Sequence, residues 1–158
     1  MTREKQDEGH RWSSVQIRVR YPECDQMGVV YHANYLNWFE IGRTEMLRQS
    51  GFTYRSMEEQ GLMLPVIDVN LKYHKPAKYD DQVIVYTQIT KLTSMRLNFA
   101  YEIRRMGADG QEPHRSELLV TGSTQHVWLN GDWKPARLDK ASPEVYQALQ
   151  KLAADRKE

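Results

Sequence analysis

The chain has 158 residues, and 22 Lys and Arg against 21 Asp and Glu give it a formal net charge of +1. Hydrophobic residues make up 40% and charged residues 27%, which is typical of a folded globular domain and excludes a disordered chain. The balanced charge argues against a broad nucleic-acid surface, and no apolar run approaches the about 18 residues that a membrane span needs. The single cysteine, Cys24, cannot form an internal disulfide, so we expect a reducing compartment, the cytoplasm.

The domain organisation is predicted to be simple, because no linker, repeat or change of composition divides the chain. Residues 1–13 are polar and charged, and we expect them to form a mobile N-terminal tail. Residues 14–158 are then one domain, which is a length that can enclose a hydrophobic core.

The predicted elements begin with a strand over residues 15–21, where apolar and polar residues alternate. Residues 34–50 carry apolar residues at helical spacing, and Gly51 follows as the residue that ends the helix. The first two turns of this helix are apolar on nearly every side, so other elements should wrap it. Four further alternating segments and a last helix opening at Ser142-Pro143 complete the chain, the strands lying at residues 67–73, 83–89, 95–103 and 118–129. This order predicts an α+β fold in which a curved antiparallel sheet covers one long central helix.

The stretch between residues 21 and 35, YPECDQMGVVYHANY, is the best candidate for a reactive site. Asp25 lies in a turn after a strand, Gly28 permits a sharp change of direction, and His32 lies at the start of the apolar helix. The first turn of a helix has free N–H groups and a positive dipole end, so it can stabilise an oxyanion. A carboxylate seven residues away can then attack the same carbonyl or activate water.

Other interpretations of these residues remain open from the sequence alone. Asp25 can serve only to cap a turn, and His32 can be a packed histidine. Cys24 is a possible nucleophile but more typical of a small buried residue, while Glu40 and Glu45 on the helix are weaker candidate acids. Five scattered histidines show no ligand-like spacing, so we expect no metal site.

The motif Asp25-x-x-Gly28-Val-Val-Tyr31-His32-x-Asn34-Tyr resembles the signature of hotdog-fold acyl-CoA thioesterases. The branch it resembles most is that of 4-hydroxybenzoyl-CoA thioesterase and the Tol-Pal-associated thioesterases. The resemblance continues through residues 73–77 and 79–81 and covers roughly residues 15 to 130. It implies the hotdog fold, in which a sheet wraps one helix and two protomers pair their sheets edge to edge as dimers or tetramers.

The resemblance also implies roles for particular residues. Asp25 is at the position of the catalytic carboxylate, described as a nucleophile or a general base depending on the member. His32 is at the position whose main-chain N–H polarises the thioester carbonyl. Tyr31 and Asn34 fall within the motif and are expected to shape the loop and cap the helix, with Tyr31 near the substrate.

The resemblance therefore predicts an acyl-CoA thioesterase that releases free acid and CoA without a metal or redox cofactor, coenzyme A being part of the substrate. The CoA phosphates need cations, and three lysines lie around Pro76, namely Lys72, Lys75 and Lys78. The same lysines also fit a solvated turn. The alternative function is a hotdog protein that binds acyl-CoA, or acts as a scaffold, without turnover.

Overall fold

The computed structural model describes residues 5–7, 10–107 and 117–154. In these residues six antiparallel strands form one sheet in the order β1-β2-β4-β5-β6-β3. The strands are β1 (Lys5–Asp7), β2 (His10–Arg18), β3 (Val66–Tyr73), β4 (Gln82–Leu92), β5 (Arg96–Arg105) and β6 (Glu117–Val127). The helices are η1 (Tyr21–Glu23), α1 (Asn34–Gln49), α2 (Tyr54–Glu59), α3 (Leu138–Ala141) and α4 (Pro143–Ala154).

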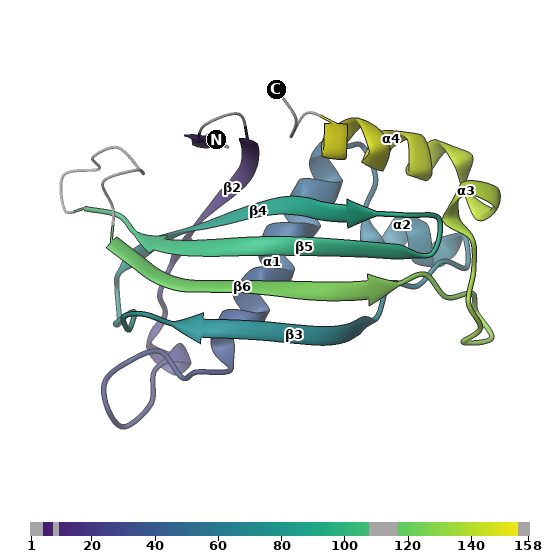
Figure 1. Cartoon of the computed structure of the whole chain (residues 1–158). Coiled ribbons are helices and arrows are strands. Elements are labelled where there is room, and N and C mark those ends of the chain that lie inside the picture. The colour runs from purple at the N-terminus through teal and green to yellow at the C-terminus, as the bar shows by residue number, and fades with distance from the viewer. Residues whose placement is uncertain (1–4, 8–9, 108–116, 155–158) are drawn as a thin grey trace.

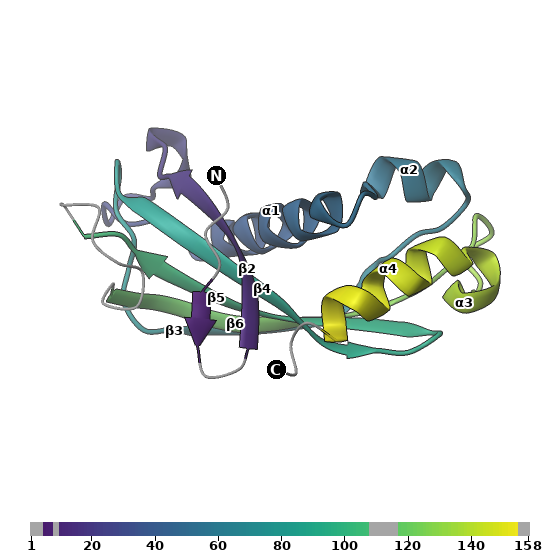
Figure 2. The ribbon, with the colours of Figure 1, turned by 90° about the horizontal axis from the view of Figure 1, so that it is seen from above.

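The long helix α1 crosses one face of the sheet (Figure 1), and α1, α2 and α4 all lie on that same side of it (Figure 2). The predicted α+β arrangement is therefore confirmed. The end of α1 is also confirmed, because Gly51 follows it with a φ of +95° and donates its N–H to the Arg48 carbonyl at 3.0 Å. A positive φ is a conformation that glycine adopts without strain.

Several elements differ from the prediction, among them β2 and α2, and the short elements β1, η1 and α3 were not predicted. The strand β2 begins at His10, inside the segment predicted as a mobile tail, and Ser13 pairs with Thr87 of β4. The domain boundaries otherwise stay a prediction. The short helix α2 was not predicted, because its six residues carry too little periodicity. Reciprocal hydrogen bonds between Thr53 and Ser56, both of 3.0 Å, cap its first turn.

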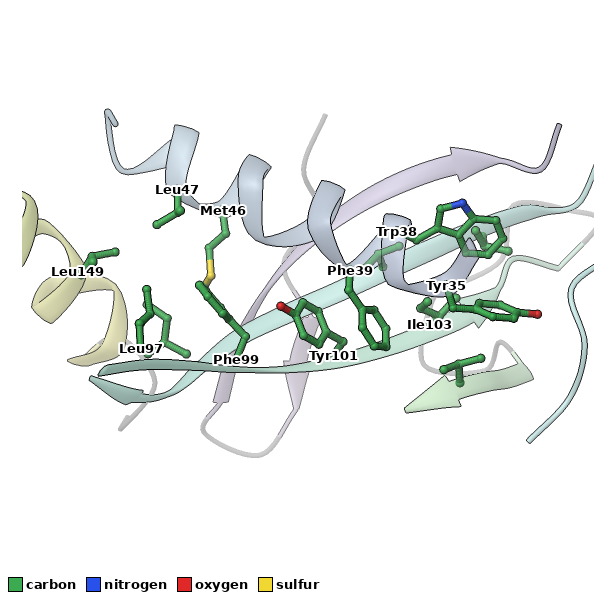
Figure 3. Close-up of a cluster of buried hydrophobic side chains, with 14 of the residues drawn as sticks. Tyr35, Trp38, Phe39, Met46, Leu47, Leu97, Phe99, Tyr101, Ile103 and Leu149 are labelled. Carbon is green, nitrogen blue, oxygen red and sulfur yellow. The ribbon is translucent and has the colours of Figure 1, made fainter. Parts of the chain in front are cut away.

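The hydrophobic core lies between α1 and the sheet (Figure 3). The Phe39 ring of α1 stacks on the Tyr101 ring of β5, with centroids 4.1 Å apart and planes 6° from parallel. Leu149 of α4 closes the far end of this core. Each large side chain buried here contributes about 1.5–3 kcal/mol relative to its exposed state, so this layer holds the helix on the sheet.

Two glycines allow α1 to approach the sheet closely. A Cβ atom at Gly42 of the helix would lie 2.5 Å from Thr87 Oγ1 and 2.9 Å from a Val85 methyl carbon. A Cβ atom at Gly122 of β6 would lie 2.6 Å from both the Asn70 carbonyl oxygen and the Phe39 ring. A real Cβ atom cannot lie so close to its neighbours. The close packing of α1 on the sheet therefore requires glycine at these two positions.

Candidate active site

The loop that connects η1 to α1 holds Asp25 in a tight turn. The Asp25 carboxylate oxygen Oδ1 accepts a hydrogen bond of 2.9 Å from the Met27 N–H, and the Asp25 carbonyl accepts one of 3.0 Å from Gly28. Gly28 has a φ of +75°, which reverses the chain, and the Asp25 N–H then reaches the Val29 carbonyl at 2.9 Å. The carboxylate thus accepts one turn hydrogen bond through Oδ1, while the side chain also lines a pocket.

The first turn of α1 begins directly after this loop. Its N-cap residue, Ala33, makes no side-chain capping bond. Within the described part of the chain, no oxygen accepts a hydrogen bond from the main-chain N–H of His32. Because the helix dipole is positive at this end, the His32 N–H is a donor suited to a developing negative charge.

Asn34 does not cap the helix, contrary to the prediction. Its side-chain Nδ2 donates a 2.8 Å hydrogen bond to the Glu23 carbonyl, which lies across the loop. Its Oδ1 accepts a 3.3 Å hydrogen bond from the Asn37 side chain rather than from a main-chain N–H of the first turn of α1. The effect of Asn34 is therefore to fix the loop, which was the other part of its predicted role.

A pocket of about 300 Å³ lies between this loop, the start of α1 and the turn after β3. Asp25 and His32 both line it, so the structure brings the two main predicted residues together. Its walls are mostly apolar, which suits a ligand that buries a narrow apolar arm. Tyr35, Tyr73, Lys75 and Pro76 are among the other residues that line it.

Two tyrosines hold the pocket together through hydrogen bonds that no local sequence pattern predicts. The Tyr73 hydroxyl of β3 donates a 2.9 Å hydrogen bond to the His32 carbonyl. The buried Tyr35 hydroxyl accepts a 3.1 Å hydrogen bond from the Ala77 N–H, and burial raises the pKa of Tyr35. The start of α1 is therefore tied both to β3 and to the turn that contains Pro76.

A network of ion pairs supports the same turn. Lys75 Nζ lies 2.8 Å from Glu117 Oε1, and Arg105 Nε lies 3.2 Å from Glu117 Oε2. Arg105 also contacts the Asp81 carboxylate at 3.2 Å and donates to the Pro76 carbonyl at 2.7 Å. The hydrogen bond from Lys75 lowers the pKa of Glu117, so this carboxylate stays charged and neutralises part of the Lys75 charge.

The other predicted binding residues do not line this pocket. The Tyr31 side chain is exposed, and its ring lies against the His32 ring with centroids 4.4 Å apart. Lys72 pairs with Thr121 in the sheet and precedes Tyr73, so it lies on the opposite face of β3. Lys78 is exposed, and its main-chain N–H donates to the Asp81 carboxylate at 2.8 Å. Of the three predicted lysines, only Lys75 lines the pocket.

The alternative reactive groups lie elsewhere. Glu40 is exposed on α1 and does not line the pocket. Cys24 is half-buried, with its sulfur 4.0 Å from the Arg20 carbonyl oxygen. Among the residues that the structure describes, no three His, Cys, Asp or Glu side chains form a group that could hold a metal ion, and reaction without a metal stays a prediction. No helix in the described ranges is long and apolar enough to span a membrane.

Comparison with known proteins gives consistent matches over most of the chain. The family model of the thioesterase superfamily (4HBT) matches residues 27–109. YneP of Bacillus subtilis is 36% identical over 140 residues, which cover 88% of this chain and 96% of that protein. The acyl-CoA thioester hydrolase YbgC of Escherichia coli is 34% identical over 110 residues, covering 70% of this chain and 78% of YbgC.

A solved structure supports the same relationship. The crystal structure of a DHNA-CoA thioesterase from Staphylococcus aureus superimposes with a TM-score of 0.82 and 38% sequence identity. The match covers 90% of this chain and 91% of that one. The family model begins at residue 27, so it includes His32 and the helix α1 but not Asp25.

Proposed function

Because this chain belongs to the thioesterase superfamily, we propose that its pocket binds an acyl-CoA, with Asp25 and the His32 N–H as the groups that hydrolyse the thioester. The predicted family and hotdog fold are confirmed, and the chain is a thioester hydrolase of the acyl-CoA thioesterase kind. The roles of Asp25 and His32 in the reaction are our proposal.

The observation that carries the proposal is that a carboxylate and an unused main-chain donor line one pocket. Asp25 and His32 both line the pocket, and the His32 N–H has no acceptor within the described residues. A thioester carbonyl placed between them would direct its oxygen to the N–H and its carbon to the carboxylate side. Such a donor typically contributes about 10²- to 10³-fold to the rate of acyl transfer.

In the general-base route, Asp25 takes a proton from a water molecule while the water oxygen bonds to the thioester carbon. The carbonyl electrons move to the oxygen, and the His32 N–H stabilises the resulting negative charge. The carbon–sulfur bond then breaks as the carbonyl re-forms. The CoA thiolate takes the proton from Asp25, and the products are the free acid and CoA.

In the nucleophilic route, an Asp25 carboxylate oxygen bonds directly to the thioester carbon and CoA leaves as a thiolate. Water then cleaves the mixed anhydride and restores Asp25. Both routes use the same two groups. Turnover in the presence of hydroxylamine separates them, because only the anhydride converts Asp25 to a hydroxamate that mass spectrometry can locate.

The CoA phosphates, on this proposal, lie near the Pro76 turn. Lys75 lines the pocket and is 60% exposed, so it is the cation best placed to contact them. Its ion pair with Glu117 reduces the charge that it offers to a phosphate. Lys72 and Lys78 remain candidates only for contacts outside the pocket.

We also propose that the protein is a homo-oligomer, either a dimer or a tetramer, of the cytoplasm. The strand β3 ends the sheet, and apolar side chains along it are exposed, at 40% for Val66, 48% for Ile67 and 41% for Val69. An uncovered edge of this kind favours pairing with another strand. The free thiol of Cys24 is consistent with a reducing compartment.

The test is thiol release from acyl-CoA by the wild type and by Asp25→Asn. We expect the substitution to lower kcat by roughly 10²-fold or more, since the amide can neither accept the proton nor attack the carbonyl. Asp132→Asn, at an exposed loop position, is the matched control and should keep wild-type turnover. His32→Ala should have the smaller effect, because its donor belongs to the main chain. Wild-type turnover in Asp25→Asn would remove Asp25 from the mechanism.

The alternative function, acyl-CoA binding without turnover, gives a different result in the same assay. A binding protein would show saturation with acyl-CoA but no release of CoA. The panel should include short-chain, long-chain and aromatic thioesters. It should include 1,4-dihydroxy-2-naphthoyl-CoA because a 38% identical neighbour is named a DHNA-CoA thioesterase.

A further inference from the structure

Glu23, the last residue of η1, accepts hydrogen bonds from residues that precede the loop carrying Asp25 and from residues at the end of that loop. Its main-chain carbonyl accepts from the Tyr31 N–H at 2.9 Å and from the Asn34 side chain at 2.8 Å. These donors lie at the far end of the loop, where α1 begins. The carbonyl of Glu23 therefore joins the two ends of residues 24–33.

The Glu23 carboxylate makes a second connection, to the body of α1. Oε2 accepts a 2.9 Å hydrogen bond from the indole Nε1 of Trp38, which is 1% exposed. Oε1 accepts from the Arg20 N–H at 2.8 Å, and the Arg20 side chain lies 3.4 Å away. The Glu23 side chain is 12% exposed, so these are largely protected hydrogen bonds to a charged acceptor, the stronger class.

Two other hydrogen bonds of the loop connect it to elements other than α1. Val30 donates its N–H to the Ala77 carbonyl at 2.9 Å, and Tyr73 contacts the His32 carbonyl. These contacts fix the loop to the Pro76 turn and to β3. Glu23 differs because it links the beginning of the loop, two residues before Asp25, directly to the second turn of α1.

We propose that Glu23 is a positioning residue that holds the Asp25 carboxylate at the start of α1, in the arrangement with the His32 N–H that turnover requires. This inference rests on the proposed roles of Asp25 and His32. Glu23 itself touches no substrate, because its carboxylate is occupied by Trp38 and Arg20. Its loss should therefore lower the rate of the chemical step more than the binding of acyl-CoA.

The experiment compares Glu23→Ala, Glu23→Gln, Trp38→Phe and the double variant Glu23→Ala/Trp38→Phe. We expect Glu23→Ala to lower kcat by about 10- to 100-fold, the usual result of misplacing a reacting group by about an ångström, with KM within about twofold. Glu23→Gln keeps one acceptor oxygen, so it should restore part of kcat. Since Glu23 and Trp38 form one connection, the double variant should be no slower than the slower single variant.

A structural readout accompanies the kinetics. The indole N–H of Trp38, identified by its loss in Trp38→Phe, should exchange with solvent faster in Glu23→Ala than in the wild type. The matched controls are Glu58→Gln on the exposed face of α2 and Trp133→Phe, at a 69% exposed side chain. Both controls should keep wild-type kcat and thermal stability.

Two results would overturn the positioning role. One is wild-type kcat in Glu23→Ala despite faster indole exchange, and the other is a loss of activity that only follows the unfolded fraction. The two proposals also fail differently. Wild-type turnover in Asp25→Asn overturns the catalytic assignment, whereas wild-type turnover in Glu23→Ala, with Asp25→Asn inactive, overturns only the role of Glu23.

Discussion

The two halves of α1 differ in whether the polar groups near them have hydrogen-bond partners. At its N-terminal end, the His32 N–H has no acceptor among the described residues, and His32 lines a pocket. Two turns later, the helix faces a buried polar cluster, in which polar side chains from α1, α2, β5 and β6 bond to one another. The cluster consists of Arg43, Tyr54, Tyr101, Thr124 and His126.

The hydrogen bonds of the buried polar cluster are almost all internal. Arg43 Nε donates to the Tyr54 hydroxyl at 3.2 Å, and the Tyr101 and Thr124 hydroxyls lie 2.6 Å apart. His126 contacts Thr124 at 2.8 Å and the Leu64 carbonyl at 3.3 Å. Burial raises the pKa of Tyr54 to about 12, and burial together with the Arg43 charge lowers the pKa of His126 to about 4.

We therefore relate the buried polar cluster to the stability of the protein and the N-terminal end of α1 to its reactivity. A buried donor with a partner contributes to the free energy of unfolding, whereas a donor left free at a pocket is available to a ligand. We therefore expect substitutions in the buried polar cluster to change stability without changing turnover. Substitutions around the pocket should do the reverse, and the Asp25→Asn test described above is the largest such effect.

Thr124→Val tests the stability side of this comparison. Removing the hydroxyl leaves buried groups of Tyr101 and His126 without their shared partner, which should cost about 2 to 3 kcal/mol of unfolding free energy. Denaturant unfolding measures this loss, and kcat of the folded enzyme should stay within about twofold. Thr90→Val, at an exposed position of β4, is the control. A large loss of kcat in Thr124→Val would contradict the separation.

His126 predicts a pH dependence of stability. Its pKa of about 4 in the folded protein lies below the value near 6.5 expected in the unfolded chain. The unfolded state therefore binds the proton first as the pH falls, and stability is lost as the pH falls from about 6.5 toward 4. Between pH 7 and pH 5 the loss from this group should be about 2 kcal/mol. His126→Asn cannot titrate, so an equally steep loss in that variant would remove His126 as the cause.

Tyr73→Phe removes one hydroxyl oxygen and tests the expectation that changes around the pocket affect turnover. Without the hydrogen bond to the His32 carbonyl, the start of α1 is less firmly oriented, and kcat should fall by about 10-fold, the size typical of a supporting residue. The phenyl ring keeps the wall of the pocket, so stability should change little. Tyr79→Phe, at a 58% exposed residue, should behave as the wild type. Equal kcat values for the two variants would show that the hydroxyl has no orienting role.

Lys75→Ala should have the smallest effect in the series. Lys75 is exposed and already paired with Glu117, so its loss should raise KM for acyl-CoA only about threefold and leave kcat unchanged. The effect should diminish as salt concentration rises, because exposed charges are screened. Lys134→Ala, at an exposed turn, serves as the control. An unchanged KM at low salt would exclude Lys75 from phosphate binding.

The elements with regular periodicity could be predicted from the sequence. The helix at residues 34–50 and the four strands after it differ from the observed elements by only a few residues at each end. Asp25 and His32 were predicted because a turn, a glycine and a helix start lie within a few residues of one another. Local chemistry of this kind is visible in a sequence.

The supporting contacts could not be predicted, because they join distant residues. Tyr73 reaches His32 across 41 positions, and Ala77 reaches Tyr35 across 42. The sequence placed Lys72 with Lys75 because both lie near Pro76. Lys72 and Tyr73 lie on opposite faces of the strand β3, and only the tertiary structure shows that the face carrying Tyr73 lines the pocket.

The glycines beneath α1 have a consequence for how such a pocket can change. A methyl group at Gly122 would push against the Phe39 ring and the Asn70 carbonyl, so it would lift the helix away from β6. Because the helix is rigid, its first turn and the adjacent His32 N–H would shift with it. The width of the cleft that receives the substrate therefore depends on the absence of a side chain at Gly122, in a strand that contributes no residue to its lining.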